Sequence, residues 1–146
     1  MRVYLDLCAL KRPFDDQTQD RIASETGAVL AIMTRIELGL DDIVWSVALT
    51  VENDADPDVE ARVEVAKYVS YATVSLVLTT QVEKRLREFT VAGFSPLDAA
   101  HLAFAESAGC TVLVTCDDRF IKRAERIDSL VRVLTPIQYW NEVAHD

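Results

Sequence analysis

The stretch VYLDLCAL, residues 3–10, combines β-branched and aromatic residues with one aspartate, and the turn-like KRPFDD follows it at once. A short apolar run that turn residues close is typical of a buried strand and its exit loop. Asp6 should therefore lie at the carboxyl end of this strand. An acid that ends a buried strand costs free energy to desolvate unless it has a partner, so its position indicates a functional site.

Four further apolar runs are typical of strands: residues 42–46, 73–78, 111–118 and 130–134. Helical patterns separate them, the longest over residues 17–40, where a stripe recurs at steps of four and three: Ile22, Thr26, Val29, Met33, Ile36 and Leu40. Because parallel strands need crossover connections, this alternation predicts a three-layer α/β/α fold around a mainly parallel sheet of about five strands. A chain of 146 residues fits a single domain over residues 1–146.

Three acids besides Asp6 are expected near the same edge of the sheet. Ser46 should cap a helix that carries Glu52 about two turns later. Asp56 and Pro57 should begin the next helix. Ser95 and Pro96 should begin another with Asp98 in its first turn, and Asp117 is one of two acids at the end of the strand at residues 111–118.

Four carboxylates in one place repel one another, and one or two hard divalent cations such as Mg²⁺ or Mn²⁺ offset that repulsion through oxygen ligands. Asp6, Glu52, Asp98 and Asp117 are therefore predicted metal ligands of a phosphodiesterase. For Asp98 the alternative is a structural role, because an acid in a first helical turn interacts favourably with the helix dipole.

Composition limits the other classes of function. No apolar run approaches the ~20 residues of a membrane helix, so we expect a cytoplasmic protein without a membrane partner. Three cysteines without CxxC spacing argue against disulfides and zinc. The net charge of −9 argues against broad affinity for nucleic acid, but basic residues follow Asp117, and we predict phosphate contacts from Arg119, Lys122 and Arg123.

The chain resembles a PIN-domain nuclease of the kind found in VapC-like toxins. The resemblance rests on VYLDLCAL, WSVALTVEN, SPLDAAHLAFAESAGC and VLVTCDDRF, which occur in the family's order across essentially the whole chain. It implies that Asp6, Glu52, Asp98 and Asp117 bind metal, and that the substrate is RNA. It further implies a protein antitoxin as partner and a homodimer.

Three residues are expected to support the ligands. Thr115 corresponds to the small hydroxyl residue of the family's last motif, and Asp118 is an adjacent acid that either assists Asp117 or caps the next helix. His101 follows Asp98 by three residues, so it shares a helix face and could bond a ligand carboxylate. One departure from the family is Leu7, where a small polar residue is usual.

Two other functions stay open. A phosphatase or phosphoryl-accepting receiver domain also places an aspartate at the end of its first strand, but Cys8 stands where such a phosphatase has a second aspartate, and no acids precede Asp6 as a receiver requires. The other alternative is a non-catalytic interaction module that kept the fold.

Overall fold

The computed structural model describes residues 1–145 and contains one sheet of five parallel strands. The strands are β1 (Arg2–Leu5), β2 (Asp42–Ser46), β3 (Ala72–Leu76), β4 (Val112–Val114) and β5 (Arg132–Leu134). Their order across the sheet is β3-β2-β1-β4-β5. This arrangement confirms the predicted parallel sheet, with β1 in its centre.

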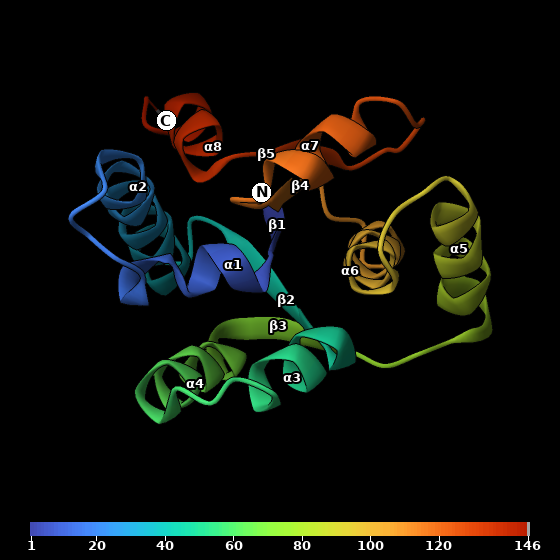
Figure 1. Cartoon of the computed structure of the whole chain (residues 1–146), viewed down its shortest axis with the longest axis horizontal. Coiled ribbons are helices and arrows are strands. Elements are labelled where there is room, and N and C mark those ends of the chain that lie inside the picture. Colours follow the sequence, from blue (N-terminus) through green and yellow to red (C-terminus); the bar gives the residue numbers. More distant parts are fainter. Residues whose placement is uncertain (146) are drawn as a thin grey trace.

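Helices cover the sheet on two sides. They are α1 (Leu7–Leu10), α2 (Asp20–Glu37), α3 (Val47–Asp54), α4 (Val59–Ala66), α5 (Thr80–Val91), α6 (Pro96–Ser107), α7 (Asp118–Ala124) and α8 (Pro136–Val143), with short 3₁₀ helices η1 (Arg12–Phe14) and η2 (Lys67–Tyr71). Figure 1 shows α2 and α8 on one side of the strands, and α5 and α6 on the other. The three-layer α/β/α fold predicted from the sequence is therefore present.

The strand order fixes where a ligand can bind. From β1 the chain moves outward through β2 to β3, and then returns to β4 on the other side of β1 before it continues to β5. In open parallel sheets of this kind, ligands bind beyond the carboxyl ends of the strands, at the point where the order reverses. Here that point lies between β1 and β4. Asp6 directly follows β1, and Thr115 directly follows β4.

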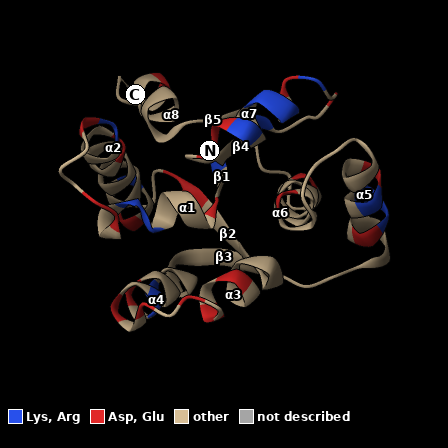
Figure 2. Ribbon diagram, viewed as in Figure 1, with Lys and Arg blue, Asp and Glu red and all other residues tan. Residues whose placement is uncertain are grey.

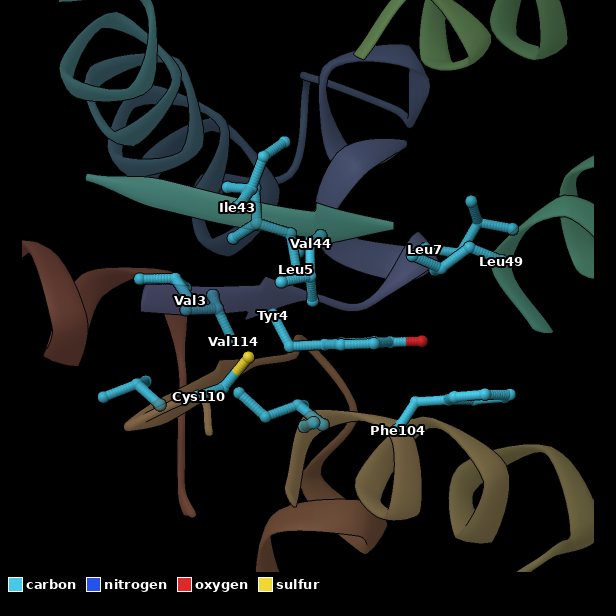
Figure 3. Packing of buried hydrophobic residues seen from close by; sticks show 14 of the residues in the cluster. Val3, Tyr4, Leu5, Leu7, Ile43, Val44, Leu49, Phe104, Cys110 and Val114 are labelled. Carbon is cyan, nitrogen blue, oxygen red and sulfur yellow. The ribbon is translucent and has the colours of Figure 1, made fainter. Parts of the chain in front are cut away.

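The core is densely apolar around the central strand. Val3, Tyr4 and Leu5 of β1 are buried, as are all three residues of β4. Figure 3 shows Tyr4 and Phe104 on the side of β1 that faces α6, with Val44 and Leu5 on the other side. A central strand that is buried on both faces holds the residues that follow it in a fixed position.

Two local predictions were wrong. The long helix ends at Glu37, so Leu40 lies beyond it and is 56% exposed. The helix expected to begin at Asp56 begins at Val59, with Asp58 as its N-cap. The Asp56 carboxylate instead accepts the backbone N–H of Asp58 at 2.9 Å and pairs with Lys11, which holds the chain in a turn before the helix starts.

A buried charge cluster closes the amino-terminal edge of the sheet. The Asp41 carboxylate, which has no exposed side-chain surface, accepts from Arg35 Nε at 2.9 Å and from the Tyr139 hydroxyl at 2.8 Å. The amino group of Met1 lies 3.2 Å from its other oxygen. Asp41 therefore links α2, α8 and the starts of β1 and β2, at the edge opposite the predicted metal ligands.

Within residues 1–145, none of the helices has the length and apolar character that crossing a membrane requires.

Candidate active site

One cavity of about 290 Å³ receives all four acids predicted from the sequence. It lies beyond the carboxyl ends of β1 and β4, at the reversal of the strand order. Seven residues line it: Asp6, Leu7, Cys8, Lys11, Glu52, Asp98 and Asp117. Side chains from four separated segments of the chain thus meet in one anionic pocket.

Asp6 is the most tightly held of the four acids, and only 5% of its surface is exposed. One carboxylate oxygen, Oδ1, accepts the backbone N–H of Leu7 at 2.7 Å, which caps α1. The other, Oδ2, accepts the Thr115 hydroxyl at 2.8 Å and the Cys8 thiol at 3.3 Å. Leu7 is buried, and the side-chain donors to Asp6 are those of Thr115 and Cys8.

Thr115 connects two of the acids. Its hydroxyl donates to Asp6 Oδ2 and accepts the backbone N–H of Asp117 at 3.1 Å. The residue is fully buried. A single hydroxyl thereby links the residues that follow β1 and β4.

Glu52 lies in the second turn of α3, and Asp98 lies in the first turn of α6. Ser46 caps α3 by accepting the Leu49 N–H at 3.3 Å, and Glu52 follows with its side chain 27% exposed. Ser95 caps α6 and accepts the Asp98 N–H at 3.2 Å. Burial, followed by the negative charges of Asp6 and Asp117, raises the pKa of Asp98 to about 6. The part of this rise that comes from the neighbouring carboxylates is a repulsion that a cation would offset.

Asp117 and Asp118 have separate roles. Asp117 lines the cavity and caps α7 by accepting the N–H groups of Arg119 and Phe120. Asp118 does not line the cavity, and its carboxylate accepts from both terminal nitrogens of Arg21 at 2.7 and 2.8 Å. The cap predicted as an alternative for Asp118 therefore belongs to Asp117, and Asp118 joins α7 to α2.

His101 lies behind the acids rather than beside Asp98. Its Nε2 is 3.4 Å from Glu52 Oε1 and 3.6 Å from Asp6 Oδ1, but neither contact has hydrogen-bond geometry, and Nε2 is buried without a partner. Burial lowers the pKa of the ring, but the carboxylates of Glu52, Asp6 and Asp98 outweigh it and raise the pKa above the ordinary value.

The predicted phosphate-binding residues lie together on and beside α7, the segment with the most blue ribbon in Figure 2. Arg119, Lys122 and Arg123 are exposed. Within the part of the chain that the structure describes, none of these three side chains forms an ion pair. Arg119 follows Asp117 by two residues, and none of the three lines the cavity, so the positive charge lies on the helix that Asp117 caps.

A scan against protein-family models matches the PIN domain over residues 4–126. The chain belongs to the PIN domain family. Membership supports a nuclease at the level of the family, because the resemblance described above is to PIN-domain nucleases. A search of curated proteins gave no match.

Solved structures share the PIN fold at low sequence identity. VapBC2 from Rickettsia felis, bound to a DNA fragment from its promoter, is 13% identical, with a TM-score of 0.58 over 91% of this chain and 97% of that one. DNA-bound VapBC from Salmonella typhimurium is 17% identical, with a TM-score of 0.57 over 93% and 98%. PAE2754 from Pyrobaculum aerophilum is 18% identical, with a TM-score of 0.51 over the whole of both chains.

The donor atoms of this PIN domain fit a hard divalent cation. Ligand atoms of Asp6, Glu52 and His101 lie within 4.8 Å of one another. Carboxylate oxygens are the ligands that Mg²⁺ and Mn²⁺ prefer. The charges of Asp6 and Asp117 contribute, after burial, to the raised pKa of Asp98, so the protein groups alone do not balance the negative charge of the site.

Four residues of this PIN domain that line the cavity or lie behind it were not predicted as site residues, although Ser46 was expected to cap a helix and Lys11 stands in the basic segment after Asp6. Lys11 and Cys8 line the cavity, and Tyr4 and Ser46 bond one another behind it at 2.6 Å. Lys11 had a local signal, because it follows Asp6 by five residues across one helical turn and a loop. Tyr4 had none, because its partners lie 42 and 97 residues away.

Proposed function

We propose that this protein is a divalent-metal-dependent endoribonuclease that hydrolyses RNA phosphodiester bonds. Asp6, Glu52, Asp98 and Asp117 would hold one or two Mg²⁺ or Mn²⁺ ions, directly or through water. The observation that carries the proposal is the meeting of these four carboxylates in one cavity at the reversal of the strand order. Membership of the PIN domain family supports the same activity.

When bound, the cation would supply Lewis acidity and an activated water for attack on phosphorus. The chain's own groups would do the rest. Asp6 is pre-oriented by Thr115 and Cys8, so it needs no rearrangement to accept a cation. The exposed bases of α7 would attract the phosphates of the strand that enters beside Asp117. No covalent enzyme intermediate is required in this scheme.

RNA is proposed as substrate, and an antitoxin as partner, from the family resemblance and from the solved structures named VapBC. On this proposal residues 1–146 form a single nuclease domain, which acts in the cytoplasm and pairs as a homodimer. The segment after residue 126 contains α8, and α8 packs against the long helix α2. This packing supports treating the segment as part of the same domain.

Metal removal tests the proposal directly. We expect purified protein to cleave single-stranded RNA with Mn²⁺ or Mg²⁺ and to lose all cleavage in EDTA, with recovery on adding back excess metal. At a free Mn²⁺ concentration a hundred times Kd, the free energy of unfolding should rise by about 2.7 kcal/mol, measured by urea denaturation. Cleavage that persists in EDTA would contradict the proposal.

Lys11 supplies a second prediction, because it is the one basic residue among those that line the cavity. Its ammonium group pairs with Asp56, and its side chain is 15% exposed. We expect Lys11 to exchange Asp56 for a substrate phosphate. Loss of one charged contact, worth about 1.5 kcal/mol, should raise KM for RNA about tenfold in Lys11→Met and leave kcat nearly unchanged.

The matched control is Lys67→Met, which breaks the pair with Glu64 on the surface of η2. Steady-state kinetics at several salt concentrations would separate the two variants, because removal of a phosphate contact lowers the salt dependence of KM. Equal KM values for Lys11→Met and Lys67→Met would assign Lys11 a purely structural role.

A further inference from the structure

Three polar side chains form a buried chain behind the acid cavity. The Tyr4 hydroxyl lies 2.6 Å from Ser46 Oγ and 2.6 Å from His101 Nδ1. All three residues are fully buried. Figure 3 shows Tyr4 extending from β1 with its hydroxyl oxygen at the end farthest from the strand. The central strand therefore reaches α6 through this side chain.

The direction of the hydrogen bonds follows from counting protons. Ser46 Oγ already accepts the N–H of Leu49, and each hydroxyl has one proton to give. If Ser46 donates to Tyr4 and Tyr4 donates to His101 Nδ1, both hydroxyl protons are used. In the opposite direction the Ser46 proton would have no acceptor among the described residues, and a buried unsatisfied donor is costly.

The same direction decides the state of the other ring nitrogen. A neutral ring that accepts at Nδ1 carries its proton on Nε2. That nitrogen faces Glu52 at 3.4 Å and Asp6 at 3.6 Å. A doubly protonated ring carries a proton on Nε2 as well. In either charge state Nε2 is a donor and has no lone pair to offer to a cation.

We propose that Tyr4 is a positioning residue that acts through His101 and thereby sets the metal preference of the site. By holding the proton on His101 Nε2, Tyr4 presents an N–H rather than a lone pair to the cavity, so His101 is not a metal ligand, although its distance alone would allow ligation. The cation then meets carboxylate oxygens only. This inference rests on the proposed function, since it concerns the same carboxylates.

An all-oxygen donor set selects Mg²⁺ or Mn²⁺, whereas an added imidazole nitrogen favours Zn²⁺. In Tyr4→Phe the proton on the ring is no longer held in place, so Nε2 can become a ligand. We expect Mn²⁺ affinity to fall about tenfold, as when a residue that orients a metal ligand is lost. Zn²⁺ affinity should rise relative to Mn²⁺.

The control is Tyr139→Phe, which removes another buried tyrosine hydroxyl, the one that donates to Asp41 at the opposite edge of the sheet. This variant should keep the wild-type affinities for Mn²⁺ and Zn²⁺. Calorimetric titration of each metal into the three proteins measures both affinities without any assay of cleavage. A fall in Mn²⁺ affinity that is equal in both variants would mean a general loss of packing and would overturn the proposal.

Nitrogen-15 NMR of the metal-free protein tests the assignment of the proton itself. We expect the His101 signals to show a proton on Nε2 in the wild type, and a bare Nδ1 whenever the ring is neutral. A bare Nε2 in the wild type would overturn the inference and leave the proposed nuclease intact. An Nε2 proton without any metal-dependent cleavage would overturn the nuclease and leave the hydrogen-bond chain intact.

Discussion

Asp6→Asn should reduce kcat/KM for RNA by about 10³-fold, because a carboxylate that holds a catalytic cation contributes several kcal/mol to transition-state stabilisation. The substitution is nearly isosteric. The asparagine oxygen can still cap α1 by accepting the Leu7 N–H, and asparagine is as good an N-cap as aspartate. The loss should therefore come from the lost charge and the lost Oδ2 acceptor at the cavity, and not from loss of the α1 cap.

The control for this loss is Asp54→Asn on α3, which removes an exposed carboxylate two residues from Glu52 but outside the cavity lining. It should keep kcat/KM close to the wild-type value. Both variants should be purified in the same way and compared at saturating Mn²⁺. An Asp6→Asn protein that cleaves within tenfold of the wild type would exclude Asp6 as a metal ligand.

Asp41→Asn should show the opposite pattern, a large loss of stability with little change in kcat/KM at 25 °C. Asp41 is the buried partner of Arg35, whose side chain is only 13% exposed. The substitution removes the buried negative charge that pairs with Arg35 and with the Met1 amino group, and we expect the free energy of unfolding to fall by about 3 kcal/mol. Urea denaturation in EDTA measures this fall without contribution from metal.

The loss should also depend on pH. Burial raises the pKa of Asp41, but hydrogen bonds from Arg35 and Tyr139, with the amino group of Met1, outweigh it and hold the pKa below its usual value. A carboxyl with a lowered folded-state pKa stabilises the protein above its unfolded pKa, and this contribution is lost as pH falls through the folded pKa. The difference in the free energy of unfolding between wild type and Asp41→Asn should thus be largest at neutral pH and should shrink as the pH falls. A difference that widens on acidification would contradict this account.

The fold was predictable because its signals are local. Each strand is an apolar run, and the caps at Ser46 and Ser95 are single residues that hydrogen-bond within their own helices. The convergence of Asp6 and Asp117 could also be expected, since carboxyl ends of parallel strands share one edge, whereas Glu52 and Asp98 were placed with them through the family motifs. The position of the helix after Asp56 was not predictable, because Asp56 is held by Lys11, 45 residues away in the sequence.

The contacts that hold the site residues in place were harder to predict from the sequence. Thr115 and Asp6 are 109 residues apart, and only the family motif pointed to Thr115. Asp118 is adjacent to a cavity residue, but its side chain turns to Arg21, 97 residues away. Tertiary packing alone brings such pairs together, so neither the periodicity nor the spacing of residues in the sequence predicts these contacts.

The central strand must meet two requirements two residues apart. Tyr4 and Asp6 lie on the same side of an extended backbone, so one reaches His101 while the other reaches the cavity. An inserted residue between them would rotate the aspartate to the far face of the sheet. An insertion or deletion between Tyr4 and Asp6 should therefore abolish activity. A similar change in the loop between α7 and β5, where Leu130 is 95% exposed, should leave activity intact.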